Sequence, residues 1–444
     1  WNGLCNLLKL SNHRRVAESM NIIQRARSFV NSLRQIAGQT AWDWRRCPHC
    51  GSTLTKKNGG YLVRPYTLEG RLEVRVQRHR CEACGKSYSE AMAWRVRRSW
   101  YAREVHRMAV DCWQHGGMSL RRTAELVRSL VGKQERWLLW RWFRAVVEPT
   151  EACYLSQSTV QRWLDQAGAE AEASVAGQLA GVHSSGQVAT DGLWARLLGR
   201  QKRVVLALVD AVTGVIHPPV VVEGEESARD WCRVFARAKQ SGLDLDEVRG
   251  VTSDGAGALT GYLSRKLSWV NHQRCHFHLW RNLKGELGSA VQAAARQLGR
   301  DVGSVVRGEL TALVRGVMDA GRYAQAEAAL AELGTHPFGA RLQELMHEHL
   351  DAVTVYLSEY NRGLARVSPE WYWRDFRLRL SRGRNHRSAR RLERAALVWA
   401  IYRNFEPAQR RSERKRTYRH PGMSPLATAG APPGEISYLD ALAV

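Results

Sequence analysis

The chain has 444 residues, of which 44% are hydrophobic and 25% are charged. This composition is ordinary for a folded protein and excludes wholesale disorder, and the length allows about two to four domains. No stretch of about 18 apolar residues occurs, so we expect no membrane-spanning helix. Lys and Arg number 67 against 42 Asp and Glu, and the resulting net charge of +25 indicates a polyanionic partner, usually nucleic acid.

The positive charge is concentrated in two stretches. Between Arg374 and Arg419 sixteen basic residues stand against four acids, and a second basic stretch runs from Arg64 to Arg107. A solvated helix face explains any single run of charge. Two clusters that flank a nearly neutral centre favour a DNA path along a folded core.

Residues 1–44 are expected to form an N-terminal helical segment. The first ten residues, WNGLCNLLKL, have no basic lead-in and no small-residue cleavage site, so we expect no signal peptide and a cytoplasmic, nucleoid-associated protein. In that compartment the nine cysteines are not expected to form a disulfide framework.

Four of the cysteines form two CxxC pairs within residues 45–95, thirty residues apart. The pairs are Cys47 with Cys50 and Cys81 with Cys84. Two such turns aim four thiolates at one ion, which is the spacing of a tetrahedral structural zinc site. Between them RLEVRVQRHR alternates apolar and polar residues, which predicts a strand and hence a β-rich zinc ribbon. His49 and His79 are alternative ligands, but four cysteines already complete the shell.

Residues 100–170 are predicted to be helical and to contain a helix-turn-helix. One helix is expected near residues 119–129, with Ser119 as its N-cap, and a second near 158–167, opening at Ser158 and entering the major groove. The residues expected to contact DNA are Arg121, Arg122, Ser158, Thr159, Gln161 and Arg162. The segment between the helices is too long for a turn and is expected to add a helix. The alternative is a plain helical bundle that links two domains.

From residue 185 to 284 strands and helices alternate. Three strands are expected first, followed by a helix, a strand, a helix, a strand and a helix. KRVVLALVDAVTG is an almost continuous apolar run and predicts a buried central strand, whereas SARDWCRVFARAKQSG predicts an amphipathic helix. This order predicts a ribonuclease H-like mixed sheet.

Two acids in this unit are placed for chemistry. Asp191 lies midway along the first predicted strand, and Asp254 ends the strand after the first helix. Adjacent strands would bring the carboxylates together, and close carboxylates repel unless a cation lies between them. Such oxygen ligands suit Mg²⁺, or Mn²⁺, and two ions can act on a phosphodiester. The alternative is that both acids are turn or N-cap residues, since Asp-Gly is a common turn dipeptide and Asp210 has a similar setting without a role.

Four ordered segments of this unit stand out together. They are Asp191-Gly-Leu-Trp194, VVLALVDAVTGV, Ser253-Asp254-Gly255 and QRCHFHLWRNL. This set resembles bacterial insertion-sequence transposases of the DDE class, close to the Mutator-like group. The resemblance implies that Cys275 and His278 form the C-x-x-H signature of that group near the site, the alternative being a core cysteine and a satisfied histidine. It covers residues 185–425, and a zinc ribbon and a helix-turn-helix are the usual N-terminal companions.

The resemblance also implies a third acid, a glutamate on a late helix within residues 365–425. Glu370 is our choice, because it opens SPEWYWRDFRLRLSRGR and is followed on the same helix face by Arg374 and Arg377. These two arginines are expected at DNA, the later one holding a phosphate. Glu393, on the next predicted helix, is the rival.

The rest of the chain is expected to support this core. Residues 285–364 are rich in Ala and Leu with helical periodicity and resemble the all-helical insertion that such transposases carry before the last acid. After Pro407 the chain is Arg-rich and then rich in Pro, Gly and Ala, which predicts a linker and, over residues 426–444, a tail.

The sequence therefore predicts a multidomain α/β transposase. It would bind double-stranded DNA at the ends of a mobile element, cleave a strand with Mg²⁺ held by Asp191, Asp254 and Glu370, and join the freed 3′-hydroxyl to target DNA. The resemblance implies a homo-oligomer on paired ends. The alternatives are an inactive, transposase-derived DNA-binding regulator and a ribonuclease H-like nuclease or resolvase without strand transfer.

Overall fold

The chain divides into two compact units. The computed structural model describes residues 45–68, 70–71, 74–92, 94–96, 98–142, 154–179, 181–198, 201–361, 364–367, 370–382, 386–407, 422–431 and 437–442. One unit comprises Trp1–Val110 and Arg121–Val160, and the other comprises Asp111–Leu120 and Gln161–Val444. The expected N-terminal helical segment, residues 1–44, lies outside the described residues, and so does much of the Arg-rich stretch after Pro407.

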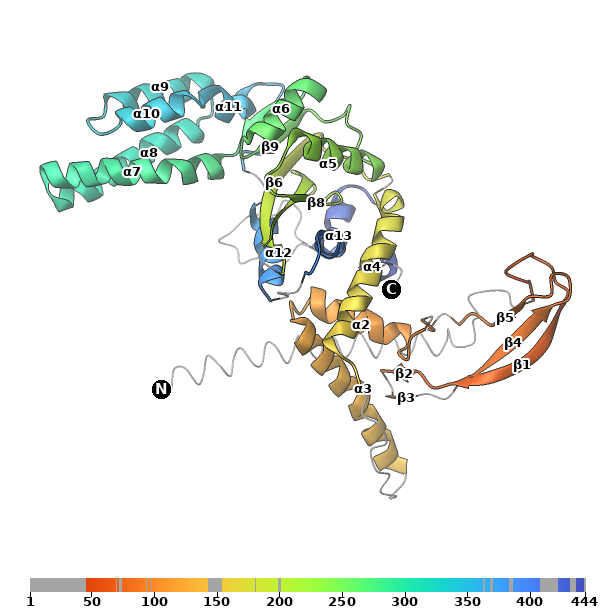
Figure 1. Ribbon diagram of the computed structural model, residues 1–444. Coiled ribbons are helices and arrows are strands. Elements are labelled where there is room, and N and C mark those ends of the chain that lie inside the picture. The colour runs from red at the N-terminus through yellow and green to blue at the C-terminus, as the bar shows by residue number, and fades with distance from the viewer. Residues whose placement is uncertain are drawn as a thin grey trace. The chain divides into compact units, whose positions relative to one another are not determined.

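A small antiparallel sheet forms the ribbon of the first unit (Figure 1). Its strands are β1 (Thr55–Val63), β4 (Val74–Cys81) and β5 (Ser87–Ser89), in the order β1-β4-β5, next to a hairpin of β2 (Tyr66–Thr67) and β3 (Gly70–Arg71). The strand predicted between the CxxC pairs is therefore confirmed from Val74 onward. The predicted alternation holds at Val74, Arg75 and Val76, which are half-buried, exposed and buried. Beyond Gln77 the phase changes, because His79 and Cys81 are buried, and this change coincides with a bulge in β1 between Lys57 and Gly60.

Three helices follow the ribbon, and two of them are longer than expected. They are α2 (Arg103–Gln114), α3 (Leu120–Trp142) and α4 (Gln157–Gln178). The helix expected to end near residue 129 continues to Trp142, so part of the segment expected to form a separate inserted helix is the end of α3. Gly132 is the one helix-weakening residue in this stretch, and a single glycine costs only about 1 kcal/mol relative to alanine, too little to end the helix.

The start of α4 also differs from the expectation. Ser158 is not the N-cap: the hydroxyl of Ser156 accepts a hydrogen bond from the backbone N–H of Thr159 at 3.2 Å, and the helix begins at Gln157. The predicted inward face is confirmed, because Val160, Trp163 and Leu164 are buried.

A mixed five-stranded sheet forms the centre of the second unit. Its strands are β6 (Gln187–Arg196), β7 (Lys202–Asp210), β8 (Val220–Glu223), β9 (Gly250–Ser253) and β10 (Asn271–Arg274). The spatial order is β10-β9-β6-β7-β8. Strand β7 is antiparallel to β6 and β8, whereas β9 is parallel to β6 and β10 is parallel to β9. Helices α5 (Ala228–Gln240), α6 (Gly257–Lys266) and α7 (His276–Leu298) follow β8, β9 and β10, so the predicted element order is confirmed.

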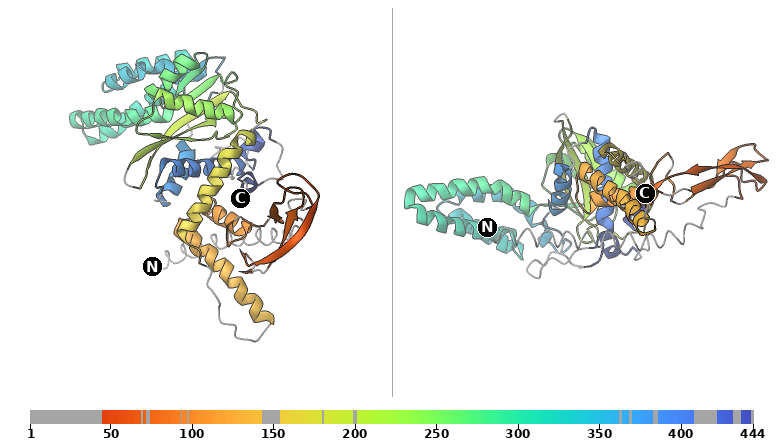
Figure 2. Two further views of the ribbon diagram at one scale, coloured as in Figure 1. Left: turned by 45° about the vertical axis from the view of Figure 1, so that its right-hand side comes forward. Right: turned by 90° about the horizontal axis from the view of Figure 1, so that it is seen from below.

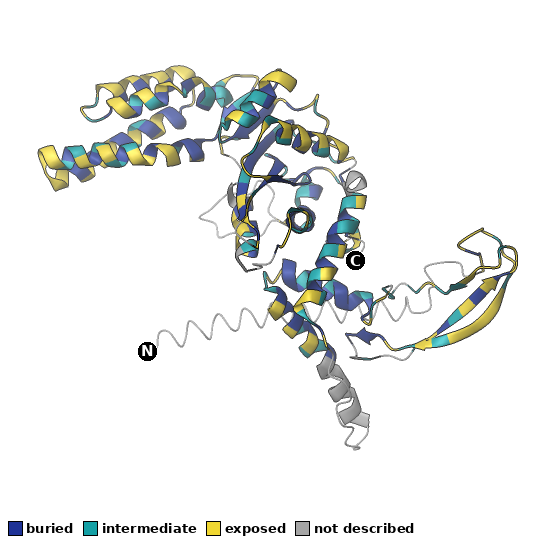
Figure 3. Cartoon of the chain, in the orientation of Figure 1, coloured by how far each residue is buried: buried dark blue, intermediate teal, exposed yellow. Residues whose placement is uncertain are grey.

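Each face of this sheet is covered by a different pair of helices, and the strands are the most buried part of the unit (Figure 3). On one face α5 and α6 pack through Trp231, Phe235 and Leu263. On the other face α12 (Glu370–Arg382) and α13 (Ala389–Phe405) pack through Phe376 and Trp399. Because side chains alternate along a strand, residues of even number on β6 face α5 and those of odd number face α12.

A helical segment extends from the sheet through α7, as Figures 1 and 2 show from three directions. It continues with α8 (Arg300–Met318), α9 (Tyr323–Thr335), α10 (Ala340–His347), α11 (Leu350–Thr354) and the 3₁₀ turn η1 (Val355–Leu357). These helices share one apolar cluster, separate from the two sheet faces. The segment expected as a helical insertion from residue 285 thus starts earlier, inside a helix that begins at His276 directly after β10.

The C-terminal residues are packed, where a free tail was expected. Leu426 in α14 (Pro425–Thr428) and Ala429 join a small apolar cluster with Leu179. Tyr438, at the start of α15 (Tyr438–Ala441), donates its hydroxyl to the Asp111 carboxylate at 2.5 Å. The Pro, Gly and Ala content suggested a linker, but the few apolar side chains interspersed in it are enough to anchor the segment.

Asn404 links α13 to the β7–β8 connection through two buried hydrogen bonds. Its Nδ2 donates to the carbonyl of Ile216 at 2.9 Å, and its Oδ1 accepts from the N–H of Ile216 at 2.8 Å. Asn404→Ala leaves both backbone groups unsatisfied, so we expect the free energy of unfolding to fall by about 2–4 kcal/mol in urea denaturation. Arg390→Ala, an exposed position on the same helix, is the control and should change stability by less than about 0.5 kcal/mol.

Candidate functional site

Three parallel strands bring the residues singled out in the sequence to one level of the sheet. Ala189 of β6 pairs with Thr252 of β9, so the same register continued by two residues places Asp191 opposite Asp254. Arg274 of β10 pairs with Ser253, which places Cys275 opposite Asp254 on its other side. With neighbouring strands about 4.8 Å apart, Asp191, Asp254 and Cys275 occupy one row across the sheet.

Asp191 is held inside the protein. Its side chain is 7% exposed, and its Oδ1 accepts a hydrogen bond from the backbone N–H of Gly192 at 2.9 Å. Its odd-numbered position puts it on the face of β6 that packs against α12. The ring Nε2 of His278 lies 3.9 Å from the same oxygen. A buried carboxylate needs such a partner or a cation, since an uncompensated buried charge is costly.

Asp254 is the first residue after β9, at the start of the turn that leads into α6. Its Oδ1 accepts a hydrogen bond from the N–H of Ala256 at 3.0 Å. This hydrogen bond agrees with the alternative interpretation of Asp254 as a turn residue. The carboxylate also acts on two basic side chains of β10: burial lowers the pKa of His272 and of Arg274, and the charge of Asp254 opposes that shift in both. Asp254 therefore stabilises the turn and places a negative charge at the end of β9, next to β10.

Asp210, by contrast, is bound by the turn after β7 and by the loop before β6. Its two carboxylate oxygens accept hydrogen bonds from the backbone N–H groups of Ser185, Val212 and Thr213 and from the hydroxyl of Ser184. These four hydrogen bonds use both oxygens of the Asp210 carboxylate and stabilise the end of β7. They agree with the interpretation of Asp210 as a structural residue without a role in chemistry.

Cys275 and His278 form a pair beside Asp191. Cys275 precedes α7 and is fully buried, and its backbone N–H donates to the carbonyl of Ser253 at 2.6 Å. A hydrogen bond with Cys275 raises the pKa of His278, and the charge of Asp191 raises it further, while burial opposes both. These two interactions shift the imidazole toward its protonated form beside the Asp191 carboxylate.

The two glutamates proposed as the third acid occupy different environments. Glu370 is the first residue of α12; the described side chains of that helix begin at Trp373, which packs against β6 and β7 on the Asp191 face. Glu393 accepts a hydrogen bond from the N–H of Val221 at 2.9 Å and pairs with Arg237. Val221 lies on β8, two strands and roughly 10 Å from β6, so the Glu393 carboxylate is bound on the side of the sheet away from Asp254.

The residues expected to contact DNA are mostly on the surface. Exposed positions are Arg121, Arg122, Ser158, Arg162, Arg374 and Arg377, whereas Thr159 and Gln161 are half-buried. Gln161 donates to the Asp165 carboxylate at 3.0 Å, and Arg121 pairs with Glu125 at 3.0 Å. Their surface placement leaves the arginines accessible to a polyanion.

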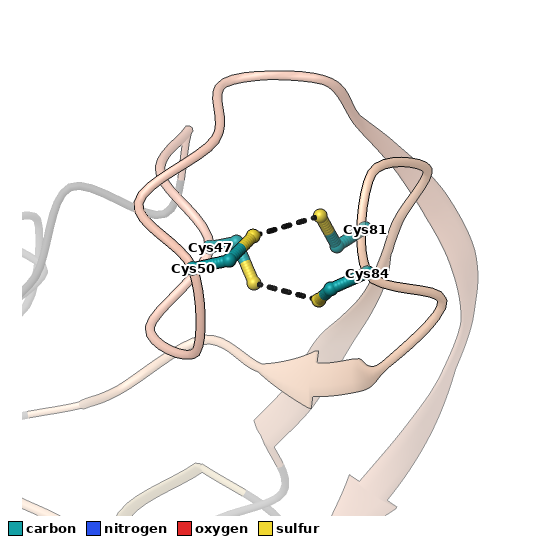
Figure 4. A group of neighbouring side chains, drawn as sticks. All are labelled: Cys47, Cys50, Cys81 and Cys84. Carbon is teal, nitrogen blue, oxygen red and sulfur yellow. Dashed lines mark hydrogen bonds between the residues drawn. The ribbon is translucent and has the colours of Figure 1, made fainter.

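The four clustered cysteines converge at one end of the ribbon (Figure 4). Their sulfur atoms all lie within 4.8 Å of one another, with 3.7 Å between Cys47 and Cys84 and 3.6 Å between Cys50 and Cys81. Four thiolates about 2.3 Å from a tetrahedral zinc ion would be roughly 3.8 Å apart, so the cluster fits zinc. A backbone hydrogen bond from Cys84 is the largest cause that lowers the pKa of Cys81 to about 7, whereas for Cys50 burial and the hydrogen bond with Cys81 outweigh a backbone hydrogen bond from Ser52 and raise the pKa to about 12. His79 is not a ligand: its Nε2 lies 3.3 Å from the Glu90 carboxylate.

One acid near the row was not identified in the sequence. Glu226, in the loop between β8 and α5, is half-buried, and its Oε2 would lie 3.6 Å from a Cβ placed on Gly192. Burial raises its pKa to about 7, and the charge of Asp254 raises it too. The expected order of strands could have indicated this position of Glu226. Strand β8 runs parallel to β6, so the loop that follows β8 leaves the sheet at the same end as the C-terminal end of β6.

Comparison with known proteins gives one family. Residues 217–302 match the model of the Mutator family of transposases. The matched segment is about a fifth of the chain and contains Asp254, Cys275 and His278, but neither Asp191 nor Glu370. No curated protein matches the chain. Within the described residues, no helix has both the length and the apolar character needed to cross a bilayer.

The cysteine cluster predicts a metal content that can be measured. We expect the purified chain to carry about one zinc ion per molecule by atomic emission, and Cys84→Ser to lose it, since three thiolates hold the ion far less tightly. The ribbon has little apolar core, so loss of the zinc ion should also lower the thermal stability of the first unit. Cys232→Ser is the control, because Cys232 is exposed and outside the cluster; equal zinc loss in both variants would contradict the assignment.

Proposed function

Because the chain carries a Mutator family transposase domain, we propose that it is a DDE transposase that binds DNA at the ends of a mobile element, cleaves one strand and transfers it to target DNA. The observation that carries the proposal is the row of Asp191, Asp254 and Cys275 across three parallel strands, with His278 at 3.9 Å from Asp191. This register brings segments far apart in the sequence to one level of the sheet, which supports the proposal.

The sheet supports a ribonuclease H-like core for this chemistry. Its order, with β7 antiparallel between β6 and β8 and two parallel strands on the other side of β6, is the arrangement expected from three consecutive strands followed by alternating helices. Asp254 follows the end of the parallel strand β9, Asp191 lies at the same level within β6, and α12 covers the face of β6 that carries Asp191. This arrangement favours Glu370 as the third acid.

The oxygen-rich donor set fits a hard divalent cation. Asp191, Asp254 and Glu370 would hold two Mg²⁺ or Mn²⁺ ions. When bound, such ions activate an attacking water or hydroxyl and stabilise the leaving oxygen of a phosphodiester. The protein orients the carboxylates: Asp191 through the backbone of Gly192, and Asp254 through the turn to Ala256. The ring Nε2 of His278, 3.9 Å from the Asp191 carboxylate, would limit repulsion within the site when the imidazole is protonated.

The reaction proposed is a hydrolysis followed by a transesterification. Water breaks one phosphodiester bond and frees a 3′-hydroxyl; this hydroxyl then attacks a target phosphodiester, whose own 3′-oxygen leaves as the new bond forms. Arg374 and Arg377, exposed on α12, would hold DNA backbone in this proposal. The zinc ribbon and the helices α3 and α4 would bind the element ends, and a homo-oligomer would hold two ends together.

The first test separates catalysis from DNA binding. Asp191→Asn keeps the size of the side chain but removes a charge that would hold a cation, so we expect Mg²⁺-dependent cleavage to fall by roughly 10²–10³-fold or more while affinity for element-end DNA is unchanged. Asp246→Asn, at an exposed position, is the matched control and should cleave normally.

The outcomes of that test distinguish the alternatives. Failure of the unaltered chain to cleave any DNA while it still binds element ends would favour the regulator. Cleavage without joining of a 3′-end in a strand-transfer assay would favour a nuclease or resolvase.

The second test decides the third acid. We expect Glu370→Gln to lose cleavage by roughly 10²–10³-fold with unchanged melting temperature. Glu393→Gln should keep cleavage but lose about 1–3 kcal/mol of stability, because Arg237 and the N–H of Val221 lose a charged acceptor. The reverse pattern would make Glu393 the catalytic acid.

A further inference from the structure

Helix α7 carries a basic stripe that does not serve the packing of the protein. Phe277, Arg281, Lys284 and Gly288 form this stripe, because residues spaced by three or four positions share one side of a helix. The first three are exposed, and Gly288 is half-buried. Among the described residues, no carboxylate oxygen lies within 4.0 Å of a side-chain nitrogen of Arg281 or Lys284. These two charges therefore face solvent and do not hold the helix to its neighbours.

The basic stripe starts beside the candidate site. The ring of Phe277, 41% exposed, has its centroid 5.5 Å from that of His278, whose Nε2 lies 3.9 Å from the Asp191 carboxylate. An α-helix rises 1.5 Å per residue, so Gly288 lies about 16 Å further along the helix axis than Phe277. The stripe thus leads from the site along the helical segment that extends from the sheet (Figure 1).

The charges of this helical segment are separated in space. Over residues 276–354 eight Lys and Arg stand against nine acids, so the segment as a whole is nearly neutral. Helix α7 alone has three basic residues and one acid, whereas residues 323–354 have five acids and one arginine. The acid of α7 is Glu286, about half a turn away from the stripe, where its charge acts on Arg341 of α10. The segment therefore attracts a polyanion to α7 and repels it from α9 and α10.

Two glycines leave the helix backbone open along the stripe. A Cβ placed on Gly285 or on Gly288 would meet no atom within 4 Å, so packing within the chain does not require glycine at either position. A glycine inside a helix costs about 1 kcal/mol relative to alanine. Close approach of a ligand to the backbone is one condition that favours glycine despite this cost.

We propose that the basic stripe of α7 binds the phosphate backbone of the double-stranded DNA that leads away from the site of cleavage, an interaction that rests on the proposed function. Arg281 and Lys284 would each neutralise a phosphate, and the two glycines would let the DNA backbone approach the helix closely. Such contacts position a duplex without reading its sequence. The stripe would therefore orient the DNA toward Asp191 whatever bases it carries.

The first test measures how the full-length chain, with its zinc retained, binds an element-end duplex over a range of salt concentrations. Replacing both basic residues together, Arg281→Gln with Lys284→Gln, removes two phosphate contacts. We expect affinity at 0.1 M salt to fall by about tenfold or more, and the slope of log K against log salt to decrease in magnitude by about 2. Arg322→Gln, at an exposed position directly before α9, is the matched control and should bind as the unaltered chain does.

A second pair of variants separates contact with DNA from the stability of the helix. Gly288→Gln fills the open space on the stripe with a better helix former. We therefore expect an unchanged or higher melting temperature together with a loss of about threefold or more in affinity for the duplex. Gly308→Gln in α8 is the control, because a Cβ there also meets no atom within 4 Å, and it should bind DNA normally.

The outcomes separate this inference from the proposed function. An unchanged salt slope in the double variant, or normal DNA affinity in Gly288→Gln, would overturn the inference and leave the proposed function standing. Failure of the unaltered chain to bind the element-end duplex at all would overturn both.

Discussion

The parallel register of β6, β9 and β10 is the constraint on which the site depends. Two short ladders, each of three or four residue pairs, fix Asp191, Asp254 and Cys275 at one level although 84 residues separate the first from the last. A slip of one residue would turn every side chain of a strand to the other face. The apolar residues of β6 oppose such a slip, because Val188 packs beneath α5 and α6 while Leu193 and Ala195 pack beneath α12 and α13.

The register places negatively charged carboxylates at one level of the sheet, and the basic side chains nearby neutralise their charge only in part. Asp191 has His278 at 3.9 Å, and Asp254 has Arg274 and His272 nearby, yet Asp254 and Glu226 still repel. A site that serves structure alone gains little from unrelieved repulsion; Asp210, whose oxygens are saturated by backbone donors, shows what such a site looks like.

The sequence predicted those parts of the fold that depend on local pattern. Apolar runs and Gly turns gave the order of strands and helices in the second unit, and CxxC spacing predicted the cysteine cluster, because both signals lie within a few residues. The sequence did not predict features that depend on packing between residues far apart in the chain. The docking of Tyr438 on Asp111 and the position of Glu226 above Gly192 both depend on residues far away in the chain. No local pattern distinguishes Glu226 from its exposed neighbour Glu225.

The basic C-terminal stretch shows a related limit of counting charges. Arg379 donates to the carbonyls of Trp113 and Gln114 at the end of α2, and Arg394 pairs with Glu172 of α4 at 3.1 Å. The latter contact requires Gly168, where a Cβ would come within 2.5 Å of Arg394. These arginines hold helices together and are not available to DNA. The surface charge of this region is therefore smaller than its sequence suggests, and it is concentrated on exposed positions such as Arg374 and Arg377 of α12, the helix that begins at Glu370. Along α12, arginines that bind other parts of the fold thus alternate with arginines that face solvent. Only the arginines on the outward face can contact a phosphate backbone.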